Sequence, residues 1–331
     1  MNTAAKDDSG GIQINKTAGF FSMFLTGFAD EAADSLALQI KATRELNWHF
    51  IETRFIDKKN LGNMSDAEFD DVCRQLDESG VSFNCYGSGI ANWACHPRKD
   101  EDLEKSMTEL KNAIPRMKKL GINMLRGMSF LVPTDEQPDS PELEKIIFDK
   151  VRKLVEICAD NGIIYGHENC MNYGGLSHLH TLKLLDAVKM DNFKLIFDTG
   201  NPTFNYRHIG SKPYTLQSAW EFYKNVREFI VYVHIKDGLA LPNEDGSRPK
   251  NTYTYAGDGM GDVRAIVRDL CATGYDGGFS MEPHVASVFH DLDNSKSMDE
   301  VRYSSYVEYG KRFEKLLAEA MQDAGRQMIL S

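Results

Sequence analysis

Short apolar segments alternate with segments of helical spacing along almost the whole chain, and this alternation restricts the fold more than any other feature. Eight apolar segments are expected strands, at 23–28, 49–54, 81–86, 122–127, 163–169, 193–198, 230–234 and 278–282. Each is followed by an expected helix, at 30–46, 65–78, 103–120, 141–161, 177–188, 215–227, 262–272 and 301–320. A helix between two strands returns the chain to the start of the next strand, so consecutive strands run parallel.

Eight such units in 331 residues predict an α/β fold, a single-domain (β/α)8 or TIM barrel over residues 20–331. A doubly wound open sheet is the main alternative. The barrel is favoured because potential metal ligands end four successive expected strands, and a closed barrel directs these ends to one centre. No phosphate-binding glycine motif opens an expected helix. The largely polar residues 1–19 are expected to form a flexible N-terminal extension.

The last four expected strands end in residues that can bind a metal ion. In chain order these residues are Glu168, Asp198, His234 and Glu282. Three carboxylates and one imidazole suit a hard or borderline divalent ion. One such carboxylate could simply cap the next helix, but that explanation fits four matching strand ends poorly. The sequence therefore predicts one divalent metal ion, with Mn²⁺ favoured and Mg²⁺ or Co²⁺ as alternatives.

The two glutamates of this set suggest a reaction. A divalent ion that holds two neighbouring oxygens of a sugar polarises the carbonyl and makes the adjacent C–H more acidic. Glu168 and Glu282 come from expected strands five and eight, so they could face each other across a bound sugar. One would remove a proton and the other would return it. We expect a sugar or keto-sugar isomerase or epimerase with Glu168 and Glu282 as its catalytic residues.

Other polar residues near the strand ends are candidate substrate-binding groups, namely Glu52, Arg54, Arg126, Lys236 and His284. Lys236 shares the face of His234, but a salt bridge to Asp237 is an alternative for it. Glu52 and Arg54 could instead belong to the polar packing layer of the barrel. His167 points away from the centre by strand alternation, so we expect it only to support the site from behind.

The net charge of −11, without any Lys/Arg run, argues against binding of nucleic acid. The apolar run 18–28 is too short to span a bilayer, and residues 1–16 lack the features of a signal peptide. Six scattered cysteines without a C-x-x-C pair suit reduced thiols. We therefore expect a cytoplasmic protein, not associated with membranes, that acts on a small carbohydrate. The connection 238–261 and the loop after His284 are expected to cover the site.

Four segments resemble the xylose isomerase-like TIM-barrel superfamily, and most closely its sugar phosphate isomerase/epimerase branch. They are residues 167–169, 197–201, 233–237 and 280–284. Residues 27–31 and 257–275 are similar to that branch as well, so the resemblance covers approximately residues 24–320. It is specific for the superfamily and says little about the substrate.

In the ketose 3-epimerases of this superfamily, a Glu, Asp, His, Glu quartet binds Mn²⁺ or a similar ion, and both glutamates act as acid and base. The resemblance assigns these roles to Glu168, Asp198, His234 and Glu282. Those enzymes carry a substrate-binding His three residues after the Asp; this chain has Asn201 there, which becomes a further substrate-binding candidate. Their Arg after the metal-binding His is not evident, and Lys236 and Asp237 stand nearby instead.

These departures leave other members of the superfamily as alternatives. One is a metal-dependent lyase on a 3-keto-glycoside or inosose, similar to C-glycoside deglycosidase catalytic subunits or inosose dehydratases. Another is a catalytically silent sugar-binding barrel. The multi-metal endonuclease IV branch needs more His ligands than this quartet supplies. The resemblance also implies a homo-oligomer or a complex with a small partner subunit.

Overall fold

Eight parallel strands form a barrel in the computed structural model, which describes residues 23–244, 247–287 and 297–325. The strands are β1 (Phe24–Gly27), β2 (Phe50–Thr53), β3 (Ser82–Tyr86), β4 (Met124–Gly127), β5 (Ile164–Glu168), β6 (Phe193–Asp198), β7 (Ile230–Ile235) and β10 (Gly278–Met281). Their order around the sheet is β1-β10-β7-β6-β5-β4-β3-β2. At the seam β1 lies beside β2, and the rings of Phe24 and Phe50 are 5.1 Å apart. The predicted TIM barrel is therefore confirmed.

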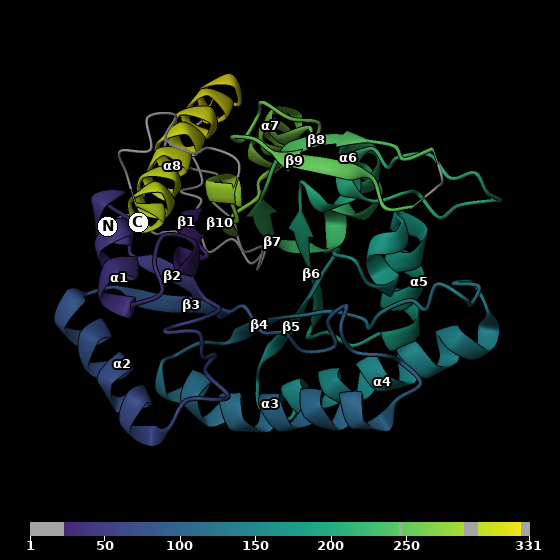
Figure 1. The fold of residues 1–331 in the computed structure, drawn as a ribbon, viewed down its shortest axis with the longest axis horizontal. Coiled ribbons are helices and arrows are strands. Elements are labelled where there is room, and N and C mark those ends of the chain that lie inside the picture. The colour runs from purple at the N-terminus through teal and green to yellow at the C-terminus, as the bar shows by residue number, and fades with distance from the viewer. Residues whose placement is uncertain (1–22, 245–246, 288–296, 326–331) are drawn as a thin grey trace, which may run out of the picture.

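Eight α-helices surround the strands (Figure 1). They are α1 (Leu36–Glu45), α2 (Asp66–Ser79), α3 (Asp100–Lys119), α4 (Pro141–Ala159), α5 (His178–Val188), α6 (Ala219–Val226), α7 (Val263–Thr273) and α8 (Met298–Asp323). Short 3-10 turns are η1 (Ala29–Glu31), η2 (Tyr173–Leu176), η3 (Asn201–Phe204), η4 (Arg227–Phe229) and η5 (Val285–Ser287). Within the residues described, no helix is both long and apolar enough to span a membrane. The predicted extension 1–19 lies outside the described residues.

Local capping explains several helix starts. A capping box starts α2, because Ser65 N donates to Glu68 Oε2 at 2.8 Å and Ser65 Oγ accepts from Glu68 N. The last helix was expected to begin at residue 301 but begins at Met298. Ser297 and Glu300 form a second capping box there, which the prediction overlooked.

Three predicted elements differ from the structure in a way that matters for the site. Residues 30–34 do not start an α-helix; η1 and a following turn precede α1, and Asp30 pairs with Arg54. Residues 215–218 are not helical, because Leu216 pairs in extended form with Tyr206 and the cap of α6 is Ser218. The connection 238–261 contains an antiparallel hairpin, β8 (Gly238–Leu241) with β9 (Lys250–Tyr253), rather than irregular loop alone.

The interior of the barrel is filled in layers. One layer contains the buried side chains of Cys85, Met124, Ile196 and Tyr232. Side chains on a strand return to the same face every second residue. Two residues beyond Met124, Ile196 and Tyr232, the next layer therefore holds Arg126, Asp198 and His234. Apolar packing below thus positions a charged layer at the carboxyl ends of the strands.

Candidate metal centre and active site

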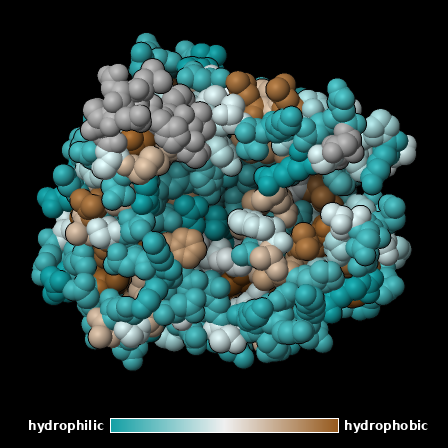
Figure 2. Space-filling view, viewed as in Figure 1, coloured by the Kyte–Doolittle hydropathy of each residue, from teal (hydrophilic) through white to brown (hydrophobic). Residues whose placement is uncertain are grey.

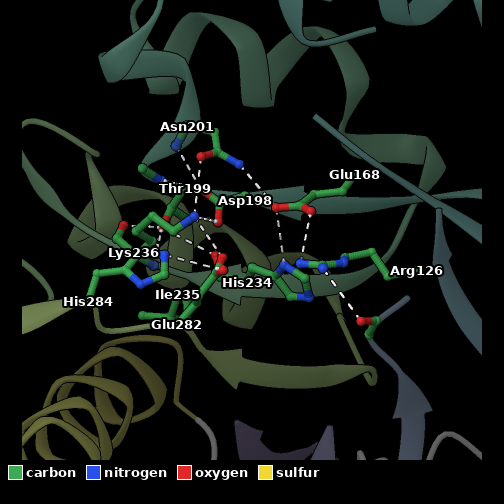
Figure 3. Close-up of polar contacts among 12 residues, drawn as sticks. Arg126, Glu168, Asp198, Thr199, Asn201, His234, Ile235, Lys236, Glu282 and His284 are labelled. Carbon is green, nitrogen blue, oxygen red and sulfur yellow. Dashed lines mark hydrogen bonds and ion pairs between the residues drawn. The ribbon is translucent and has the colours of Figure 1, made fainter. Parts of the chain in front are cut away.

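The four predicted metal ligands come together at the carboxyl ends of β5, β6, β7 and β10 (Figure 3). One potential ligand atom from each of Glu168, Asp198, His234 and Glu282 can be chosen so that all lie within 4.8 Å of one another. The four residues are buried, with at most 4% of their surface exposed. Residues at the ends of four different strands therefore form a single cluster.

One buried atom of each of these residues has no hydrogen-bond partner apart from nearby charged side chains. The atoms are Glu168 Oε2, Asp198 Oδ2, His234 Nδ1 and Glu282 Oε2. Buried polar atoms are seldom left without partners, so this cluster of acidic groups favours a nearby cation. A cationic group close by is Lys236 Nζ, 2.6 Å from Glu282 Oε2 and 3.1 Å from Asp198 Oδ2. This donor set, three carboxylates and one imidazole, fits a hard or borderline divalent ion.

His234 is held from the opposite side of the barrel by Glu52. Its Nε2 lies 3.1 Å from Glu52 Oε2, and both side chains are fully buried. The second ring nitrogen, Nδ1, is thereby turned toward Glu168, whose Oε1 is 3.5 Å away. Burial alone would lower the pKa of His234, but the carboxylates of Glu52 and Glu168 together raise it to about 10. Glu52 therefore determines which nitrogen of His234 faces the centre.

Asp198 is fixed by main-chain groups. Its Oδ1 accepts from the N–H groups of Gly200 at 2.9 Å and Asn201 at 2.6 Å, which leaves Oδ2 directed at the centre. Burial raises the pKa of Asp198 to about 6, against the opposing effect of Lys236. The Asn201 side chain donates to Glu168 Oε1 at 3.0 Å and accepts from Lys236 at 3.2 Å. Asn201 thus connects two potential metal ligands with the lysine.

Glu168 and Glu282 each have an arginine partner. Arg126 lies 3.4 Å from Glu168 Oε2, and Arg54 lies 3.0 Å from Glu282 Oε1. Burial acts to raise the pKa of Glu168, but Arg126 and His234 together lower it to about 2. The pKa of Glu282 also lies well below its usual range, because Lys236 and other nearby cations outweigh burial. Both carboxyl groups are therefore ionised near neutral pH.

Arg54 also binds two acidic residues that the sequence reasoning did not select. Its Nε donates to Asp30 at 2.8 Å, and its NH2 lies 3.6 Å from Glu31. Glu31, Glu282 and His284 form a second compact cluster, but the Arg54 guanidinium already neutralises it. The available signal was the acidic pair directly after the first strand, which had been interpreted as the start of a helix.

A cavity of about 560 Å³ opens over the centre. Glu168 and Glu282 line it together with five predicted substrate-binding residues, Arg54, Arg126, Asn201, Lys236 and His284. The sixth, Glu52, is not among the lining residues and contacts His234 instead. Phe55, Trp93 and Tyr253 also line the cavity, and nothing in the sequence patterns had selected them.

Residues 40–303 match the sequence model of the xylose isomerase-like TIM barrel. The chain belongs to this family. No curated protein matches the chain. Among solved structures, a xylose isomerase-like TIM barrel protein from Mycobacterium smegmatis in complex with magnesium is similar, with a TM-score of 0.64 and 18% identity. That match covers 91% of this chain and 98% of the other.

Two further structures have the same fold as this xylose isomerase-like barrel. The IOLI protein with a bound zinc atom has a TM-score of 0.65 and 17% identity over 91% of this chain and 99% of the other. A D-allulose 3-epimerase from Methylomonas sp. in complex with D-allulose has a TM-score of 0.61 and 18% identity. That match covers 88% of this chain and 97% of the epimerase chain. At these identities the similarity concerns the fold.

The structure also places Lys236 and His167, two further residues singled out from the sequence. Lys236 does not form the alternative salt bridge, since the Asp237 carboxylate accepts from main-chain N–H groups of the glycine-rich turn Gly257–Gly261. His167 lies on the other face of β5 from Glu168, with Nε2 3.0 Å from Ser129 Oγ. Burial lowers the pKa of His167 to about 4, so its ring is neutral. A supporting role for His167 stays a prediction.

Proposed function

We propose that the protein is a divalent-metal-dependent isomerase or epimerase of a sugar or keto-sugar. The observation that carries this proposal is the set of four buried ligand atoms within 4.8 Å of one another, two of them from glutamates that line a cavity. Glu168, Asp198, His234 and Glu282 would hold the ion. When bound there, the ion would polarise a sugar carbonyl and make the neighbouring C–H more acidic.

Glu168 and Glu282 are suited to proton transfer. Their strands, β5 and β10, are three positions apart in the ring, so a sugar between them presents different faces to the two carboxylates. Both groups are ionised, so either can accept the proton. The glutamate on the other face first takes up a proton from water and then delivers it to the deprotonated carbon, which changes the configuration or the position of the carbonyl.

Lys236 supplies positive charge where negative charge develops. Its Nζ lies between Asp198 and Glu282, at the wall of the cavity. In this position the ammonium can donate a hydrogen bond to the substrate oxygen that becomes enolate-like after proton removal. Arg54, Arg126, Asn201 and His284 also line the cavity and would bind the remaining sugar oxygens.

A lyase acting on a 3-keto-glycoside or inosose is the second candidate. Proton removal beside the carbonyl is the same first step, and expulsion of a group from the next carbon would follow it. The observation that favours this candidate is the lining of the cavity, which includes the exposed rings of Phe55 and Trp93 in addition to the charged residues. That region would accommodate a leaving group.

Proton exchange in deuterated water tests the proposal. With Mn²⁺ or Mg²⁺ present, we expect deuterium to enter the carbon beside the carbonyl of a substrate from a panel of ketoses and keto-glycosides. Glu168→Gln and Glu282→Gln should lower the exchange rate by about 10²–10⁴-fold. Glu104→Gln, an exposed residue on α3, is the matched control.

The products separate the two candidates. Epimerised or isomerised sugar supports the first, and loss of water or of an attached group supports the lyase. Exchange that survives complete metal removal and both Gln variants would overturn the proposed mechanism.

A further inference from the structure

Two large, exposed aromatic side chains line the cavity together with its charged residues. Phe55 and Trp93 keep 43% and 42% of their surface exposed. Single exposed apolar residues are common on proteins and need no explanation. These two, however, line the same cavity as Glu168 and Glu282. Figure 2 shows a hollow near the middle of the face in view, bordered by both hydrophobic and hydrophilic residues. An apolar region continuous with a charged site indicates a ligand of mixed character.

The topology places these rings across the barrel from two of the ligands. Phe55 follows β2, and Trp93 lies in the connection between β3 and α3. In the ring of strands β2 is four positions from β6, and β3 is four positions from β7. The loops that carry Phe55 and Trp93 therefore leave the barrel on the side opposite the strands of Asp198 and His234. A molecule that reaches from one side to the other must extend over both regions.

The size of the cavity agrees with such a molecule. Its volume of about 560 Å³ lies in the range of about 300–1,000 Å³ that suits drug-sized ligands. One sugar ring held by the charged residues would leave the aromatic part of this volume unfilled. Aromatic side chains pack best against flat faces that carry C–H or ring carbon atoms.

We propose that the substrate is a glycoside or a similar two-ring molecule, whose second ring packs on Phe55 and Trp93 while its reacting sugar lies at the metal ligands. The proposal rests on the proposed function for the position of the reacting sugar. The second ring is a group with an apolar face, either an aryl group or another pyranose. Phe55 and Trp93 then select the substrate, and the charged residues act on it.

Tryptophan fluorescence and calorimetry can test this proposal without any turnover. The chain has three tryptophans, of which Trp48 is buried and Trp220 is half-buried, so Trp93 is the exposed reporter. Full-length protein with Mg²⁺ would be titrated with phenyl glucoside, cellobiose and glucose. We expect at least one two-ring probe to bind about tenfold more tightly than glucose and to shift the emission. This corresponds to about 1.4 kcal/mol.

Trp93→Ala and Phe55→Ala should reduce the affinity for the two-ring probes to that for glucose, while Trp93→Phe retains most of it. Trp220→Phe is the matched control and should keep the full difference between probes. Circular dichroism would verify that each variant is folded. Tighter binding of phenyl glucoside identifies an aryl group as the second ring, and tighter binding of cellobiose identifies a pyranose.

Equal affinities for glucose and both two-ring probes, unchanged in Trp93→Ala, would overturn the aromatic subsite while leaving the proposed function intact. Burial of Trp93 by self-association, seen as concentration-dependent emission and sedimentation without sugar, would also overturn it. Absence of binding by every sugar, together with absence of proton exchange, would overturn both proposals.

Discussion

The two halves of the barrel contribute differently to the charged centre. The half formed by β5, β6, β7 and β10 carries the potential metal ligands. The half formed by β1 to β4 and their loops carries groups that hold those ligands. Glu52 contacts His234, Arg126 contacts Glu168, and Arg54 contacts Glu282. The first half of the chain thus contributes to the site mainly by orienting the potential ligands of the second half and by balancing their charge.

Asp198 is the exception in this comparison. Within the described residues, no side chain of the β1–β4 half forms a hydrogen bond or ion pair with Asp198, and main-chain N–H groups just beyond β6 fix one of its oxygens. A ligand can therefore be positioned either by its own loop or by a partner across the barrel. The following predictions test how far the two halves differ in importance.

The largest effect is expected from removal of a ligand. Asp198→Ala or His234→Ala should lower the affinity for Mn²⁺ by more than about 100-fold, the upper end of the effect of residues that only support ligands. Isothermal titration calorimetry of metal-free protein measures this affinity, and Glu104→Gln serves as control. Retention of wild-type affinity in both Ala variants would place the metal elsewhere.

Arg54→Met should have the largest effect on stability. It leaves Asp30, Glu31 and Glu282 close together without the guanidinium, and the Glu282 side chain is only 5% exposed. Loss of one partner from a buried ion pair costs about 3–5 kcal/mol, and the free energy of unfolding should fall by about that amount. Urea denaturation measures it. Arg74→Met, on the exposed face of α2, is the control, and equal losses in both variants would contradict the prediction.

Glu52→Gln should weaken metal binding by about 10–100-fold, the usual effect of removing a carboxylate behind a metal-binding histidine. The amide keeps the size of the side chain but no longer presents only acceptors to His234 Nε2. Calorimetry with Mn²⁺ gives the affinity. An unchanged affinity would show that the β5–β10 half orients His234 by itself.

Lys236→Met should separate metal binding from catalysis. The ammonium competes with the ion for Asp198 and Glu282, so its loss should raise the metal affinity by up to about tenfold, or 1.4 kcal/mol. Proton exchange should fall in the same variant, since the group proposed to stabilise the developing charge is gone. Parallel losses of affinity and exchange would mean that Lys236 is needed to assemble the site.

The smallest effect on the metal is expected from His167→Asn. His167 is adjacent to Glu168 in sequence, but its ring contacts Ser129 and packs against Gly174 on the other face of the strand. The affinity for Mn²⁺ should change by much less than tenfold, which is the smallest usual effect of removing a residue that supports a metal ligand. A larger change, measured by the same titration, would show that the outer face of β5 controls the position of Glu168.

The barrel and the ligand quartet were predictable from sequence because their signals are local. Each strand is a short apolar run, and Glu168, Asp198, His234 and Glu282 occupy equivalent ends of four such runs. Parallel strands in a closed ring bring equivalent ends together. The role of Glu52 had no such signal, since its contact with His234 joins residues 182 positions apart. Strand alternation placed Glu52 in the interior but could not name its partner.

By itself, the sequence therefore determined the repeated strand–helix pattern, the family and the residue types at four strand ends, because alternation and spacing are properties of neighbouring residues. The tertiary structure alone decided which nitrogen of His234 faces the centre, which acidic residues bind Arg54, and that Phe55 and Trp93 share a cavity with Glu168. These are contacts across the ring. They depend on the closure of the barrel and on the course of its loops, which no local pattern encodes.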